Sequence, residues 1–182
     1  SAFALAGDVK RLLLVRHAKA VAGGPDIEDF DRELAVRGMH DASAMGRYLH
    51  KCDYAADLLW TSPAARAAQT ARLLAAEMDP APGSLARDAL YLAGAEAIVA
   101  MVRAASRDAH ALMIVGHNPG LEEAAQLLAR EPVRTRERAR RDVLEEKFPT
   151  GAVAVLDFDV ARWRLIEPGT AKLADFVRPR DL

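Results

Sequence analysis

The chain has 182 residues, of which 51% are hydrophobic, so it can bury one substantial core. We therefore expect a single domain over residues 1–182. The 25 Lys and Arg residues nearly balance the 26 Asp and Glu residues, and the formal net charge is −1. No overall field therefore favours nucleic acid or an anionic membrane surface as a partner.

The single cysteine and the hydropathy pattern indicate the cellular compartment in which the protein is expected. Cys52 is the single cysteine, which excludes an intramolecular disulfide and a cysteine cluster for a metal, and which fits a reducing compartment. No stretch approaches the roughly 20 apolar residues that span a bilayer. The N-terminal SAFALAGDVKR lacks a basic segment before a long apolar one. We expect a cytoplasmic protein without a membrane partner.

The first predicted strand, residues 10–17, is a buried apolar run that ends abruptly in charge. Residues 12–15 are typical of a strand buried on both faces, and Arg16 and His17 follow them directly. In an open α/β sheet ligands bind at the carboxyl ends of the strands, so this pair suggests an anionic site. A satisfied or capping histidine beside a surface arginine is the alternative. Both side chains reach one pocket only if the chain leaves strand geometry there.

The second predicted strand, residues 58–60, leads directly into a helix. Ser62 is a good N-cap and Pro63 a good first helical residue, so the helix should run to about Glu77. Arg66 then lies in its first turn, where unpaired backbone N–H groups and the helix dipole favour an anion. An exposed helical arginine without a ligand is the alternative.

The same arrangement recurs after a third buried run, residues 111–115. His117 follows this strand, Asn118 is an N-cap candidate, and Pro119 suits the first position of a helix that should end near Arg130. His117 therefore occupies the same position relative to its strand as His17 does.

The connecting segments complete the N-terminal two thirds. Gly and Pro residues predict a loop over residues 18–31, and apolar residues at helical spacing predict amphipathic helices over residues 36–51 and 95–106. Residues 89–92 are expected to form a further strand or an extended link.

The C-terminal third mixes one charged segment with apolar ones. Residues 131–147 hold five arginines and a lysine against five acids, which favours a solvated loop or helix with ion pairs over a nucleic-acid patch. This segment could instead shape the rim of the site. Residues 152–159 and 162–166 predict an antiparallel hairpin, and residues 176–182 an irregular end.

Alternating strands and helices predict a three-layer α/β sandwich with a mainly parallel central sheet and an antiparallel C-terminal addition. Parallel strands would bring two arginines and two histidines to one edge: Arg16, His17, Arg66 and His117. Arginines donate to phosphate oxygens, one neutral imidazole can attack phosphorus, and the other can donate to an oxygen. This set requires no metal or cofactor. A catalytic zinc ion needs three protein ligands, and no carboxylate or cysteine is expected at the same edge of the sheet.

Three segments, LVRHAKA, TSPAARAAQTA and IVGHNPG, resemble in order and spacing the signatures of the histidine phosphatase superfamily, which has the phosphoglycerate-mutase-like fold. DFDRELAVRGMHDASAMGRYL and PTGAVAVLDFDVARWRLIEPG resemble its SixA-type phosphohistidine phosphatases. The resemblance implies that His17 is the nucleophile that becomes phosphorylated. It implies that Arg16, Arg66 and His117 hold the phosphoryl oxygens. Ser62 and Asn118, which share the strand ends with Arg66 and His117, are expected as further substrate-binding residues. Ala35 departs from the family, which commonly has a hydroxyl N-cap there.

The function expected from this resemblance is metal-independent hydrolysis of phosphohistidine on a protein, such as a histidine phosphotransfer domain in signalling, through a covalent intermediate. Two alternatives stay open: a phosphatase of small phosphomonoester metabolites, and a catalytically silent phosphate-binding module. Larger members of the superfamily carry an acidic residue that protonates the leaving group. Asp88 and Glu96 are the nearest acids here, and neither lies in a motif that matches.

Overall fold

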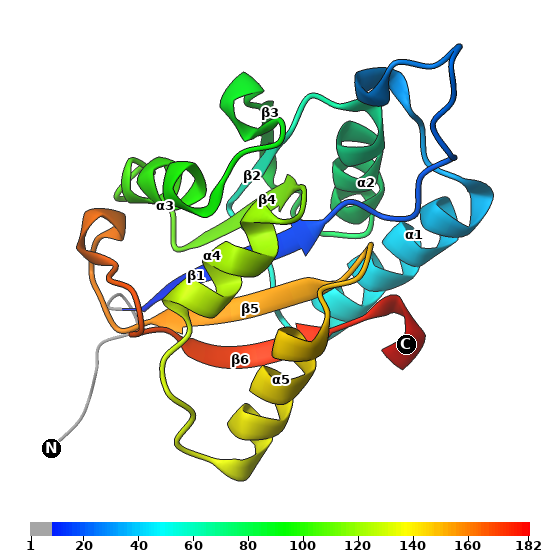
Figure 1. The fold of residues 1–182 in the computed structure, drawn as a ribbon. Helices are drawn as coiled ribbons and strands as arrows, with labels where there is room; N and C mark the ends of the chain where they lie inside the picture. Colours follow the sequence, from blue (N-terminus) through cyan, green and yellow to red (C-terminus); the bar gives the residue numbers. More distant parts are fainter. Residues whose placement is uncertain (1–8) are drawn as a thin grey trace, which may run out of the picture.

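The computed structural model describes residues 9–182. Residues 1–8, which the predicted single domain includes, lie outside the described residues. The centre of the fold is a six-stranded sheet (Figure 1). Its strands, in spatial order, are β3 (Gly83–Ala86), β2 (Leu58–Thr61), β4 (Ala111–Gly116), β1 (Lys10–Arg16), β5 (Val153–Phe158) and β6 (Lys172–Val177).

The first four strands in that order run parallel, and the last two run antiparallel to their neighbours. The predicted mainly parallel sheet with an antiparallel C-terminal addition is therefore confirmed.

Helices cover both faces of the sheet and make three layers (Figure 1). Alternate residues of β1 serve the two faces: Leu12 and Leu14 pack in one cluster, and Leu13 and Val15 in the other. All four are at most 1% exposed, which explains their uninterrupted apolar run. One face carries α1 (Val36–Lys51) and α2 (Ala65–Ala76), and the other carries α3 (Ala95–Arg103), α4 (Gly120–Leu128) and α5 (Thr135–Glu146).

Two predicted strands were wrong. Residues 88–90 form a short 3-10 turn, and the edge strand is β3, which the sequence hides because all four of its residues are exposed. The partner of β5 is β6, so the predicted irregular end contains Phe176 and Val177 of a strand. Residues 163–165 instead form a 3-10 turn, where buried Trp163 donates its indole N–H to the Ala109 carbonyl at 2.8 Å.

The charged segment 131–147 forms α5, and its ion pairs confirm the solvated-helix interpretation. Arg141 pairs with Glu145 at 2.6 Å and exposed Arg138 pairs with Glu131 at 3.6 Å, whereas Glu137 is buried and pairs at 2.8 Å with Arg130, which precedes the segment. No helix within residues 9–182 is long and apolar enough to cross a membrane.

The predicted N-caps of α2 and α4 were also wrong. α2 begins at Ala65 with Ala64 at its N-cap, and α4 begins at Gly120 after Pro119. Ser62 and Asn118 lie outside the helices. Ser62 Oγ lies 2.7 Å from a nitrogen of His117 and accepts from the Ala64 N–H at 3.3 Å, and Asn118 Nδ2 donates to the Phe148 carbonyl at 2.9 Å.

Candidate active site

A polar cleft of about 330 Å³ lies at the carboxyl edge of the parallel strands. The structure brings five of the six predicted site residues to its lining, and places Ser62 directly behind His117. Four cationic side chains and two imidazoles surround this space. The residues that line it are Arg16, His17, Lys19, Ala20, Arg32, Arg66, Leu92, His117, Asn118 and Thr150.

Arg16 and His17 reach the same cleft because the chain leaves strand geometry between them. β1 ends at Arg16, and the Gly151 N–H donates to the carbonyls of both residues, at 3.1 Å and 3.0 Å. Gly151 has a φ of +78°, and a Cβ there would lie 2.8 Å from a side-chain carbon of Pro179. A glycine is therefore required at the position that closes this turn.

His17 is 8% exposed, and its Nε2 lone pair accepts a hydrogen bond from Arg66 Nε. Its Nδ1 lies 2.8 Å from the Ala18 carbonyl, which can only accept, so Nδ1 carries the proton. The Nε2 lone pair then faces the guanidinium of Arg66, whose Nε lies 3.3 Å away. Burial, assisted by the nearby cations, lowers the pKa of His17 to about 3, so the ring is neutral at pH 7.

His117 is also buried and neutral. Its Nδ1 lies 3.4 Å from Arg66 Nη2, which can only donate, so Nε2 carries the proton and donates to Ser62 Oγ at 2.7 Å. Burial and the charge of Arg66 lower the pKa of His117 to about 4. Ser62 is fully buried and touches this ring instead of lining the cleft. The geometry therefore makes Ser62 a support for His117, which differs from the predicted contact with substrate.

Arg16 and Asn118 are tied to the same backbone carbonyl. Arg16 Nη1 and Asn118 Nδ2 donate to the Phe148 oxygen at 3.0 Å and 2.9 Å. Arg16 Nε and Asn118 Oδ1 are buried and have no hydrogen-bond partner among the described residues. An unpaired buried donor costs about 1–3 kcal/mol, and such a group is typical of a ligand site. Arg16 thus lines the cleft with one donor, Nε, that no described residue uses.

Comparisons with known proteins agree with this geometry. Residues 12–87 match the model of the histidine phosphatase superfamily, branch 1. An uncharacterized protein of Mycobacterium tuberculosis (strain H37Rv) is 35% identical over 167 residues, covering 91% of this chain and 100% of the relative. The structure from Agrobacterium tumefaciens provisionally named phosphohistidine phosphatase SixA is 30% identical, with a TM-score of 0.72, and covers 93% of this chain and 98% of that one. The chain belongs to the histidine phosphatase superfamily.

Within the superfamily, the chain is similar to the SixA-type phosphatases. A second structure, provisionally named phosphohistidine phosphatase SixA, from Nakamurella multipartitia, has a TM-score of 0.80 at 29% identity and covers 94% of this chain and 96% of that one. The predicted family and its phosphoglycerate-mutase-like fold are therefore confirmed. The chain is an enzyme of the phosphatase class.

The structure also places beside Arg66 a carboxylate, Asp29, that sequence reasoning missed. The Asp29 carboxylate accepts hydrogen bonds from Arg66 Nη2 at 3.0 Å, from the Tyr91 hydroxyl at 2.7 Å and from Arg32 Nη1 at 3.0 Å. These donors, Tyr91 first among them, lower the pKa of Asp29 to about 2. Asp29 lies within a segment that resembles SixA-type phosphatases, but no spacing rule connects a loop residue to an arginine 37 positions later.

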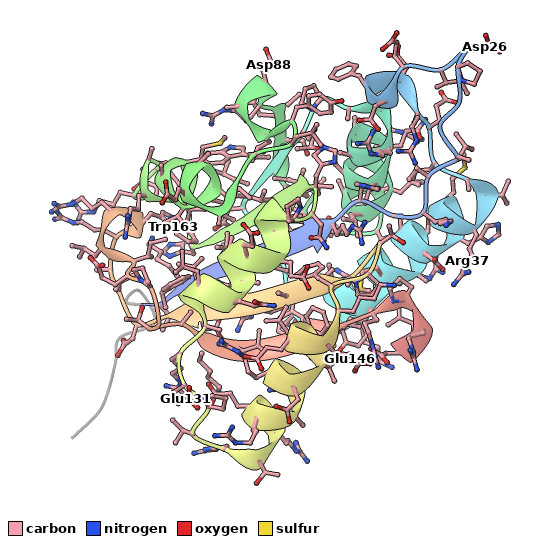
Figure 2. All side chains as sticks on the ribbon, in the orientation of Figure 1. Asp26, Arg37, Asp88, Glu131, Glu146 and Trp163 are labelled. Carbon is pink, nitrogen blue, oxygen red and sulfur yellow. The ribbon has the colours of Figure 1, made fainter. Side chains whose placement is uncertain are left out.

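The two acids considered from the sequence lie outside the cleft of this histidine phosphatase. Asp88 and Glu96 are exposed and absent from its lining, and the Asp88 side chain points outward at the margin of the molecule (Figure 2). Among the described residues no carboxylate lines the cleft. Within residues 9–182 no three His, Cys, Asp or Glu side chains gather in a way that could hold a metal ion. The ionisable side chains that line the described cleft are therefore those of arginine, lysine and histidine.

Proposed function

We propose that this enzyme hydrolyses phosphohistidine carried on another protein. The His17 Nε2 lone pair forms a bond to phosphorus while the P–N bond of the substrate breaks, and its electron pair goes to the departing imidazole. Water then attacks the phosphorus of phospho-His17. The N–P bond breaks, Nε2 regains its lone pair, and inorganic phosphate leaves as H2PO4−, which carries both protons of the water.

Fixed donors stabilise the phosphoryl oxygens in this proposal. Arg16 lines the cleft and its Nε has no partner among the described residues, and the Nε and Nη2 atoms of Arg66 face His17 and His117. His117 adds a donor if its proton moves to Nδ1, a change that an arriving anion favours. The Ser62 hydroxyl supports both forms of the ring, because it can accept from Nε2–H or donate to a bare Nε2.

The observation that carries the proposal is the lack of a carboxyl group that could protonate an alkoxide among the described residues that line the cleft. A phosphomonoester expels an alkoxide, whose departure gains greatly from a general acid. Asp29 is the carboxyl nearest to Arg66, and with a pKa of about 2 it is ionised at neutral pH and cannot fill that role. An imidazole protonated on its second nitrogen leaves as a neutral ring, and its reference pKa of about 6.5 makes that protonation easy near pH 7.

Phosphomonoester turnover is therefore expected to depend strongly on the leaving group, with activated aryl phosphates cleaved far faster than alkyl phosphates. Asp88→Asn and Glu96→Gln should each leave phosphohistidine turnover within about tenfold of wild type, equivalent to roughly 1.4 kcal/mol of barrier. Initial rates across a series of aryl and alkyl phosphates and phosphohistidine test this for all three proteins. Fast cleavage of alkyl phosphates that disappears in either variant would replace our proposal with a small-metabolite phosphatase.

A basic hollow beside the cleft favours a protein as the carrier of the phosphohistidine. It has a volume of about 190 Å³ and shares Lys19 and Thr150 with the cleft. Three arginines and Asp41 also line it, together with two prolines: Arg37, Arg178, Arg180, Pro149 and Pro179. A phosphotransfer domain with acidic residues near its phosphohistidine would match this charge. The single cysteine fits our proposal that the two proteins meet in the cytoplasm.

Reversing the charge of this hollow is expected to lower kcat/KM for protein substrates and to spare free phosphohistidine. The double variant Arg37→Glu with Arg180→Glu should lower kcat/KM for a phosphorylated phosphotransfer domain by about tenfold or more, because like charges then face each other. Free phosphohistidine should be turned over at nearly the wild-type rate.

A matched control reverses two exposed charges at the other end of the sheet. The control is the double variant Arg107→Glu with Arg164→Glu. The Arg107 carbonyl accepts a hydrogen bond from Lys10, the first residue of β1, and Arg164 follows Trp163 in the 163–165 turn. This control should leave both rates unchanged. Equal losses on the protein and on free phosphohistidine in the Arg37 and Arg180 variant would argue against protein docking at the hollow.

A further inference from the structure

The guanidinium of Arg66 is held along one edge and presented along the other. Nη1 donates to the Asp29 backbone carbonyl at 2.6 Å, and Nη2 donates to Asp29 Oδ2 at 3.0 Å. Along the second edge, Nε lies 3.3 Å from His17 Nε2 and Nη2 lies 3.4 Å from His117 Nδ1. The side chain of Arg66 is only 4% exposed. Asp29 thus contacts the edge formed by Nη1 and Nη2, and the histidines lie along the edge formed by Nε and Nη2, so the two edges share Nη2.

Asp29 is itself fixed by its neighbours. Its Oδ2 also accepts from the Tyr91 hydroxyl at 2.7 Å, and its Oδ1 accepts from Arg32 at 3.0 Å. The Tyr91 ring meets both His117 and Phe30 edge-on, with centroids 5.6 Å and 5.2 Å apart. The residues that hold Asp29 therefore include one that packs on the second histidine of the site, so these contacts join the 29–31 turn to the cleft.

We propose that Asp29 is a positioning residue, which clamps the outer edge of Arg66 so that its inner edge forms a fixed fork for two phosphoryl oxygens. This inference rests on the proposed function, since it assigns the inner edge to the phosphoryl group. A guanidinium with both edges unrestrained samples several rotamers, and ordering it would cost binding energy each time an anion arrives. The clamp removes that cost in advance.

The clamp has an unusual consequence for charge. Asp29 is an anion beside an anion site, so simple electrostatics requires that its neutralisation should tighten oxyanion binding. If Asp29 instead competed with the phosphoryl group for Arg66, removing its charge would also tighten binding. Positioning predicts the opposite sign, because a loosened Arg66 loses its bidentate geometry.

The test compares Asp29→Asn with Asp31→Asn, using tungstate as a tetrahedral oxyanion probe in titration calorimetry. Both variants remove one negative charge from the same 3-10 turn, Asp29–Asp31, and Asp31 is exposed and outside the cleft lining. We expect Asp29→Asn to weaken tungstate binding by about tenfold or more, in line with the loss of a charged hydrogen bond. Asp31→Asn should bind tungstate as tightly as wild type or slightly tighter. Unchanged or tighter binding by Asp29→Asn would overturn the proposal.

The Arg66 Nε–H resonance provides a readout that a purely structural role would not move. In a ¹H–¹⁵N spectrum, this signal is assigned by its loss in Arg66→Lys. It should be sharp in wild type and Asp31→Asn, and broadened or absent in Asp29→Asn, while the backbone amide signals stay in place. An unchanged Arg66 signal in Asp29→Asn would overturn the clamp even if tungstate binding falls.

Tyr91→Phe gives an intermediate variant that keeps the ring packing. It removes one of the donors to Asp29 and should weaken tungstate binding by a smaller factor, about two- to fourfold. Full wild-type affinity would mean that the hydroxyl of Tyr91 contributes nothing to the clamp, which would contradict our model of a fixed Asp29. Tungstate binding needs no turnover. Failure of phosphohistidine hydrolysis would therefore refute the proposed function and leave the result on Asp29 to be judged separately.

Discussion

Replacing His17 with alanine is expected to abolish turnover of every phosphorylated substrate, with a loss of at least about 10⁴-fold. The His17 Nε2 lone pair is the nucleophile in our mechanism. The resemblance of LVRHAKA to the superfamily signature implies that His17 is the residue that attacks phosphorus, whereas the same resemblance assigns His117, in IVGHNPG, to the phosphoryl oxygens. Steady-state phosphate release from phosphohistidine measures the loss, and circular dichroism checks that the variant is folded.

His40→Ala is the control for this experiment. His40 is exposed on α1 and has no place in the cleft lining, so its removal should leave turnover unchanged. Substantial phosphate release by His17→Ala would mean that another group attacks phosphorus. A catalytically silent phosphate-binding module would instead bind tungstate in wild type and release no phosphate from any substrate.

Replacing Arg66 with lysine is expected to reduce kcat/KM by about 10²- to 10³-fold, although the positive charge is kept. Arg66 contacts Asp29 through one edge and faces both histidines through the other. A lysine ammonium is a point charge that cannot span these two sets of partners. The loss should appear for free phosphohistidine as well as for a phosphorylated protein, because the group acts on the phosphoryl oxygens.

Arg72→Lys provides a matched substitution on the same helix. Arg72 is exposed on α2, outside the cleft, and its replacement should leave kcat/KM unchanged. Wild-type rates in Arg66→Lys would place the arginine outside the chemistry of the site and contradict our mechanism.

The sequence predicts those residues of the cleft lining that stand at the ends of strands. Arg16 and His17 follow a run that is apolar because both faces of β1 are covered, and His117 follows β4 in the same way. Parallel pairing of these strands then brings their ends together. Such positions follow from local periodicity and one topological rule.

Other features depend on tertiary contacts that the sequence does not encode locally. β3 has no apolar run because it lies exposed at the sheet edge. Trp163 and its neighbours suggested a strand, because a short apolar group has no clear period, whereas they pack as a turn.

The polar network of the site was equally hidden from the sequence. Ser62 and Asn118 have the chemistry of N-caps, yet their side chains bond to His117 and Phe148. Asp29 belongs to a loop whose position is set by contacts with Arg66, Arg32 and Tyr91. A side chain that can satisfy either a local or a distant partner cannot be assigned from spacing alone.

The central claim is that the phosphoryl group passes through His17, and a rapid-quench experiment tests it most directly. A phosphotransfer domain carrying ³²P-phosphohistidine is mixed with the enzyme, quenched in alkali within milliseconds and digested, and the labelled peptide is identified by mass spectrometry. We predict alkali-stable, acid-labile label on the peptide that contains His17, formed and lost fast enough to account for turnover. Label on His117, or turnover with no enzyme-bound phosphate, would contradict the mechanism.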